Sequence, residues 1–138
     1  MTIVESNKLI AEFMGAREMT FKEGTKGHSF WNTPFEGFRA FPNGSSNYYN
    51  YEDEGYHKSW DWLMSVVEKI ESMDHTYVNI SKSKASIHPY IYDIEKDAIQ
   101  HHPPITILNT GSKSKLEIVY EVVVEFIKKH PTLAQQIK

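Results

Sequence analysis

The sequence has no cysteine among its 138 residues. This absence excludes a disulfide framework, a zinc site built on thiolates and a thiol nucleophile. A chain of this length buries roughly two-thirds of its unfolded surface, so it needs neither a metal nor a disulfide to fold. We therefore expect the protein to be held by its hydrophobic core and to require no cofactor.

Basic residues in excess and long apolar runs are also missing. The 15 basic and 18 acidic residues give a formal net charge of −3. Direct, sequence-specific binding of nucleic acid is not expected, because domains of that class usually carry a clear basic excess. No stretch approaches the roughly 18 apolar residues of a membrane span, and the N-terminus does not resemble a signal peptide. The sequence predicts a cytoplasmic protein, or a small protein made inside a host cell, without membrane contact.

What remains is the composition of a globular protein. Hydrophobic residues make up 40% of the chain, aromatic residues 13% and charged residues 24%. We predict a single domain over residues 1–138 of the α+β class, with the element order α-β-β-α-β-β-β-α. Within it, residues 16–58 form an irregular, aromatic-rich insertion and residues 131–138 form a C-terminal tail.

Apolar residues at helical spacing predict three helices, over about residues 2–14, 59–73 and 114–129. Each begins at a residue that caps a helix well and has an acidic residue in its first turn. The pairs are Thr2 with Glu5, Ser59 with Asp61, and Ser114 with Glu117. In the second helix Lys69 is expected to lie off the apolar stripe. Gly15 and Pro131 are typical stop residues after the first and third helices.

Between the second and third helices the apolar period changes to two, which predicts strands over 77–81, 85–92 and 105–108. Pro89 removes a hydrogen-bond donor from the middle of these, so that strand is expected to be an edge or to be interrupted. Residues 93–100 fit either a helical turn or a loop. Two more strands are predicted over 19–22 and 37–41. We expect three to five antiparallel strands against the second and third helices.

The seven histidines do not show the spacing of a metalloprotease, and the chain has no nucleophile elbow and no phosphate-binding loop. Gly111, Ser112 and Lys113 could hold an anion at the start of the third helix. A capped helix start with lysines for solubility explains them better. We therefore expect no catalytic residues and no metal site, although a site built from distant histidines is not excluded by sequence.

The most unusual feature is a dense aromatic run between Phe30 and Trp62, interleaved with asparagine, arginine and histidine. These residue types are typical of binding surfaces, since they give a large contact area at low entropy cost. Part of the run, Trp60 and Trp62 included, is better explained as core. The candidate partner- or ligand-binding residues are Arg39, Asn47, Tyr48, Tyr49, Tyr51, Glu52, Asp53, Glu54, Tyr56 and His57.

Three blocks carry a resemblance to a known family: Asn7–Gly15 (NKLIAEFMG), Tyr56–Glu71 (YHKSWDWLMSVVEKIE) and Val119–Lys128 (VYEVVVEFIK). They resemble small uncharacterised proteins of Bacteroidota and their phages, and the order of elements is similar to the phage ABA sandwich domain. Two places depart from the pattern: Ser65, and Lys129 with His130 at the end of the third helix. The resemblance implies a phage or prophage accessory origin and no reaction, because the matched residues mostly serve packing and capping.

Two classes of function fit these observations, with an enzyme as a third. The first is a non-enzymatic phage protein that inhibits a host antiviral defence component, such as a CRISPR effector, through protein–protein contacts. Its partner is a host protein, for instance a nucleoprotein effector. The acidic run Glu52–Glu54 is explained best as a solvated face, and recognition of a basic partner is the alternative. The second is a sponge for a nucleotide immune signal, with aromatic stacking and Arg39. A small metal-dependent enzyme is the third. A homodimer is also expected, because exposed apolar helix faces need cover.

Overall fold

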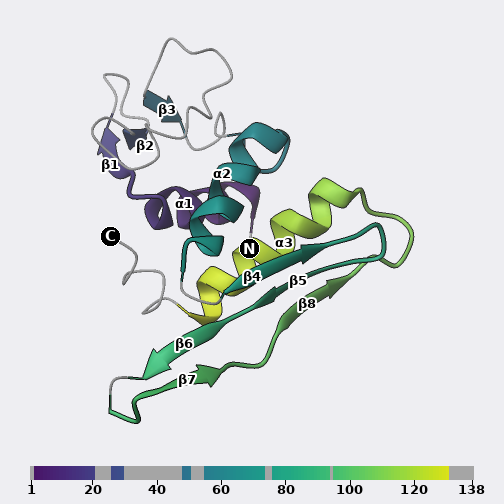
Figure 1. The fold of residues 1–138 in the computed structure, drawn as a ribbon. Helices are drawn as coiled ribbons and strands as arrows, with labels where there is room; N and C mark the ends of the chain where they lie inside the picture. Colours follow the sequence, from purple (N-terminus) through teal and green to yellow (C-terminus); the bar gives the residue numbers. More distant parts are fainter. Residues whose placement is uncertain are drawn as a thin grey trace. The chain divides into compact units, whose positions relative to one another are not determined.

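The computed structural model describes residues 2–20, 26–29, 48–50, 55–73, 76–93 and 95–130. It divides the chain into two compact units, Met1–Val66 and Val67–Lys138. Helices and antiparallel strands follow one another along the chain (Figure 1). The α+β class expected from the sequence is confirmed. The element order differs from the predicted one, because the described part of the chain forms more and shorter strands.

Helix α1, Ile3–Phe13, is closed at both ends by local hydrogen bonds. The Thr2 hydroxyl accepts a hydrogen bond from the Glu5 amide at 3.1 Å, which makes Thr2 the N-cap. At the C-terminal end Gly15 adopts a φ of 92°, and its amide and the next one donate to carbonyls of the last turn. This is a Schellman motif, where glycine avoids the strain of left-handed backbone. Both predicted helix ends are confirmed.

A three-stranded antiparallel sheet follows α1 in the order β1-β2-β3. Its strands are β1 (Arg17–Thr20), β2 (Lys26–Ser29) and β3 (Tyr48–Asn50). The first strand begins earlier than the predicted range 19–22. Neither β2 nor β3 was predicted, because the glycine, serine and asparagine residues in and beside them are typical of turns. The predicted strand 37–41 lies outside the described residues.

Helix α2, Trp60–Glu71, begins after a tight turn in which the Gly55 carbonyl accepts the amides of Lys58 and Ser59. Its predicted apolar stripe is confirmed, with Leu63 and Ile70 fully buried. Lys69 is buried as well, so the prediction that it lies off the stripe is wrong. Burial lowers the pKa of Lys69. Most residues of the helix are buried or half-buried, and the exposed ones are Trp60 and three acidic residues.

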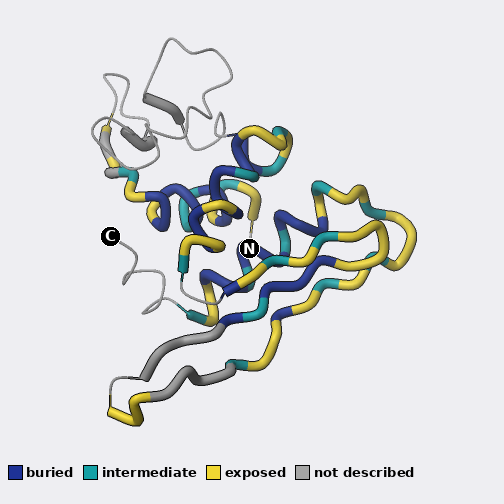
Figure 2. Tube along the Cα trace, viewed as in Figure 1, coloured by how far each residue is buried: buried dark blue, intermediate teal, exposed yellow. Residues whose placement is uncertain are grey.

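The second unit contains a three-stranded antiparallel sheet in the order β4-β5-β8. Its strands are β4 (Tyr77–Ile80), β5 (Lys84–His88) and β8 (Ile105–Leu108). The central strand β5 is the most continuously buried. In β4 exposed residues alternate with half-buried ones, and in β8 exposed residues alternate with buried or half-buried ones (Figure 2). The period-two pattern in the sequence therefore predicted these strands correctly.

The predicted strand 85–92 is interrupted at Pro89, as the missing backbone donor requires. β5 ends at His88 and β6 (Tyr90–Asp93) begins after the proline, pairing with β7 (Ala98–His101). The two strands form a hairpin that continues the β5–β8 ribbon (Figure 1). The stretch left open as a turn or loop is thus the tip and second strand of this hairpin. Asp97 at the tip has a φ of 47°, which aspartate tolerates in turns.

Helix α3, Lys115–Lys129, lies across one face of the β4-β5-β8 sheet and contacts β5 and β8 (Figure 1). This contact confirms the packing of the third helix on the sheet; the same packing of the second helix stays a prediction. The predicted capping box is present, with Ser114 and Glu117 bonding each other's amides. The residues buried in its middle are Ile118, Val119, Tyr120, Val122, Val123, Val124, Phe126 and Ile127.

Candidate functional site

Two of the candidate residues, Tyr56 and His57, lie in the turn before α2. Tyr56 is 0% exposed, and its ring packs edge-on against Trp62 with ring centroids 5.0 Å apart. Edge-to-face contacts of this kind stabilise a buried aromatic pair beyond the area they bury. The ring of Tyr56 therefore anchors the end of the aromatic run in the protein interior.

Gly55 is required where the chain enters this turn. A Cβ at this position would lie 2.7 Å from the Cδ1 atom of Trp62 and 2.9 Å from its Nε1 atom. Real Cβ contacts are essentially never this short, and the Trp62 ring is fully buried and cannot move aside. Only glycine lets the backbone pass so close to the indole.

His57 lies next in the turn and is tied to α1. Its Nδ1 atom is 3.0 Å from the amide nitrogen Nδ2 of Asn7, a fully buried side chain. An amide nitrogen only donates, so Nδ1 accepts and the imidazole proton resides on Nε2. Burial lowers the pKa of His57, and the neighbouring Lys58 lowers it further. The contact holds a neutral imidazole at the end of the aromatic run.

The two tryptophans of α2 differ in their surroundings. Trp62 belongs to the core, as predicted. Trp60 is 39% exposed, so the expectation that it is a core residue is wrong. It occupies the first position of the helix, where the neighbouring Asp61 is exposed too. Trp60 is an aromatic surface residue that the composition of the run did not single out.

Tyr48 and Tyr49 lie in strand β3, where Tyr48 pairs with Ser29 and Tyr49 with His28. Strand β3 is an outer strand of the β1-β2-β3 sheet. The structure thus fixes the backbone of both tyrosines in a sheet rather than in a free loop. The candidates outside the described residues are Arg39, Asn47, Tyr51, Glu52, Asp53 and Glu54. The set as a whole stays a prediction.

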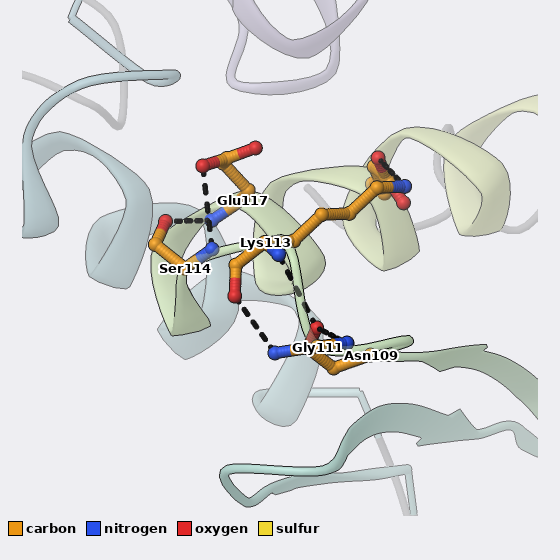
Figure 3. Close-up of polar contacts among 6 residues, drawn as sticks. Asn109, Gly111, Lys113, Ser114 and Glu117 are labelled. Carbon is orange, nitrogen blue, oxygen red and sulfur yellow. Dashed lines mark hydrogen bonds and ion pairs between the residues drawn. The ribbon is translucent and has the colours of Figure 1, made fainter.

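The loop before α3, which sequence singled out as a conceivable anion site, uses its donors internally (Figure 3). The Asn109 side-chain oxygen accepts the amide of Gly111 at 2.9 Å and that of Lys113 at 3.4 Å. The Asn109 amide nitrogen donates to the carbonyls of Lys113 at 2.8 Å and Lys82 at 3.2 Å. Asn109 therefore organises the loop and takes the place that an anion would occupy on two of its amides.

The charge of this loop is also compensated. The ammonium group of Lys113 lies 2.6 Å from a carboxylate oxygen of Glu121, a residue within α3. In the capping box the amides of Ser114 and Glu117 donate to side-chain oxygens of Glu117 and Ser114, so they do not serve as donors to an anion. The interpretation that this is a capped helix start, rather than an anion site, is the one these contacts favour.

A second cluster was missed by the sequence analysis and lies on the face of the sheet that β4 and β5 share. Tyr77 pairs with His88 across the strands, and their rings stack 4.4 Å apart at 7°. The Nε2 atom of His88 is 3.0 Å from the Ser86 hydroxyl. Ser86 is only 3% exposed, so this hydrogen bond satisfies a buried hydroxyl rather than presenting a nucleophile. The register of the two strands was the missing signal.

Two histidines of the second unit, His102 and His130, are in ring contact. His102, before β8, packs edge-on against His130 at the end of α3, with ring centroids 5.4 Å apart. The ring of Phe126 lies 5.5 Å from that of His130. Burial lowers the pKa of His130, and the charges of His102 and Lys129 lower it further. Among the residues with described positions, no three histidine or acidic side chains converge as metal ligands.

Within the described ranges no helix is long and apolar enough to cross a membrane. Comparison with known proteins adds no family: no protein-family model, curated protein or solved structure matches this chain.

Proposed function

We propose that this chain is a non-enzymatic accessory protein of phage or prophage origin that binds a host protein. Its contact region is the part of the aromatic run from Arg39 to His57. The observation that supports this proposal most is the position of β3, which carries Tyr48 and Tyr49 at the edge of its sheet. Among the described strands, β3 pairs with β2 alone.

An edge strand with tyrosines suits recognition of a protein. Its outward backbone groups can accept a strand of a partner, which gives affinity, while the side chains give specificity. The run is held at its end by Tyr56 in the interior and by the hydrogen bond from Asn7 to His57. Such anchoring limits the entropy lost on binding, because the end of the segment is already ordered.

The kind of partner is argued from charge and from the resemblance. The acidic run Glu52–Glu54 complements a basic surface, as a nucleoprotein effector of host defence would present. The resemblance to small phage proteins supports an inhibitory role against antiviral defence, for instance against a CRISPR effector, in the host cytoplasm. The inhibitory role is inferred by analogy with other small phage proteins.

The test is a pulldown of the tagged chain from bacterial lysate, with the eluate analysed by native mass spectrometry. We expect a stoichiometric host protein with wild type, and its loss with the combined variant Arg39→Ala, Tyr48→Ala, Tyr49→Ala. The affinity of the purified pair should fall at least about tenfold, as expected when aromatic and arginine anchors are truncated. Tyr77→Ala, an exposed tyrosine outside the run, is the matched control.

The outcomes separate the alternatives. Capture of the same partner by the triple variant would contradict a contact region in the aromatic run. A bound nucleotide with no protein partner would replace this proposal with a sponge for a nucleotide signal. If the partner is a defence component, its activity should be suppressed by wild type and by Tyr77→Ala, and not by the triple variant.

A further inference from the structure

Strand β4 forms one edge of the β4-β5-β8 sheet, and no strand of the described chain pairs with its outer side. The Ser81 amide donates to the Lys84 carbonyl across the turn at 2.9 Å. Backbone groups alternate in direction along an antiparallel strand, so Ser81 and Asn79 direct theirs toward β5. Val78 and Ile80 consequently direct their N–H and C=O groups away from the sheet.

This edge lacks the usual protection against pairing. Natural edge strands carry charged side chains, proline or a bulge that prevent a second sheet from adding on. The sequence of β4, Tyr-Val-Asn-Ile, has no charge and no proline, and its register with β5 runs without a bulge from Tyr77 to Ile80. Tyr77 is 41% exposed, and Asn79 is exposed. The backbone is therefore flanked by side chains that do not block an approaching strand.

We propose that β4 pairs antiparallel with β4 of a second copy of this chain, about a two-fold axis at Asn79. The pairing joins the two β4-β5-β8 sheets into one continuous sheet. Self-pairing requires that opposed residues point to the same face, so the axis passes through a residue and not between two. An axis at Asn79 sets Val78 opposite Ile80 of the second copy, and Ile80 opposite Val78.

The hydrogen bonds favour this axis over the neighbouring one at Val78. With the axis at Asn79, both outward-facing residues of each copy exchange N–H···O=C bonds with outward-facing residues of the other. With the axis at Val78, Ile80 would face Thr76, whose amide already donates to the Met73 carbonyl at 3.1 Å. With the axis at Asn79, the outward N–H and C=O groups of Val78 and Ile80 therefore all find hydrogen-bond partners on the second copy.

The side chains are self-complementary in the same register. Val78 and Ile80, both half-buried on one face, meet each other across the interface. On the other face Asn79 meets Asn79, whose amide groups both donate and accept, and Tyr77 meets Ser81. No pair brings like charges together, and cross-strand contacts between β-branched residues stabilise a sheet. This self-complementarity is the reason that a second copy, rather than another protein, is proposed as the occupant.

The test is sedimentation velocity of the full chain over a range of concentrations. We expect wild type to form dimers, and Asn79→Lys and Asn79→Asp each to weaken dimerisation at least about tenfold by placing like charges on the axis. Mixing the two variants should restore a dimer, because opposite charges then meet. Thr106→Lys, on the exposed face of the other edge strand, is the matched control and should dimerise like wild type. Circular dichroism confirms that each variant is folded.

The possible results decide the proposal. A monomeric wild type at every concentration would overturn it, as would dimers of Asn79→Lys as strong as those of wild type. Failure of the mixed variants to associate would overturn the axis at Asn79. The inference does not depend on the function proposed above, because β3 and the aromatic run take no part in it.

Discussion

At the scale of single residues, the partly buried histidines are the groups whose charge bears most on stability. His57 accepts a hydrogen bond from Asn7, and His130 packs between His102 and Phe126. Burial lowers the pKa of both imidazoles. In each case the folded protein favours the neutral ring, while the unfolded chain binds a proton at the ordinary value of 6.5.

The sign of the pH dependence follows from this difference. The unfolded chain takes up protons more readily than the folded protein. These two imidazoles therefore leave the free energy of unfolding unchanged above about pH 6.5 and lower it as the pH drops toward the folded pKa values. We expect His130→Gln to flatten this fall, because glutamine cannot be protonated beside His102 and Lys129. The measurement is the free energy of unfolding in urea at a series of pH values. Equal slopes for wild type and variant would contradict the prediction.

At the scale of elements, helix ends carry much of the local order. The N-cap hydroxyls of Thr2 and Ser114 each accept an amide of the first turn, at 3.1 Å in both helices. These contacts connect residues three apart in sequence, so they form as soon as the helix does. Asn109 connects residues farther apart in sequence, because its side chain donates both to the Lys82 carbonyl in the β4–β5 turn and to the Lys113 carbonyl before α3.

The cap of α3 makes a direct prediction. Ser114→Ala removes the acceptor for the Glu117 amide and should lower the free energy of unfolding by about 1 kcal/mol. Glu117→Gln is the matched control, because glutamine also completes a capping box and should leave stability nearly unchanged. Urea denaturation of both variants measures the difference. A loss of equal size in the two variants would mean that the charge of Glu117, and not the cap, stabilises the helix start.

At the scale of the whole molecule, the division of the chain falls inside a helix. The two units meet between Val66 and Val67, and α2 runs through this point from Trp60 to Glu71. All three tryptophans, Trp31 among them, belong to the first unit. Tryptophan fluorescence therefore reports on that unit alone.

This arrangement allows the predicted single domain to be tested. Ile87→Val removes one buried methyl group from the second unit and should cost about 1 kcal/mol. If the chain unfolds as one domain, the midpoint of unfolding followed by tryptophan fluorescence should shift as much as the midpoint followed by circular dichroism. Thr106→Ser, at an exposed position of β8, serves as the control. A fluorescence midpoint that does not move would show two independently unfolding units.

The sequence was most informative where structure depends on neighbours along the chain. Helix caps, the Gly15 stop and the interruption at Pro89 all follow from contacts or steric limits within a few residues, and each was predicted at the right place. The alternation in β4 and β8 was equally readable, because successive residues of an outer strand point to opposite faces of the sheet and differ in exposure. The α+β class follows from these local patterns together.

Features that join distant residues were decided only by the tertiary structure. Strand β3 exists through its pairing with β2, the Tyr77–His88 stack through the register of β4 with β5, and the His57–Asn7 contact through a separation of 50 residues. Composition likewise did not tell exposed Trp60 from buried Trp62. Local patterns are set by steric and hydrogen-bonding limits that each segment meets alone. Register and burial depend on which segments pack together, which the folded chain alone determines.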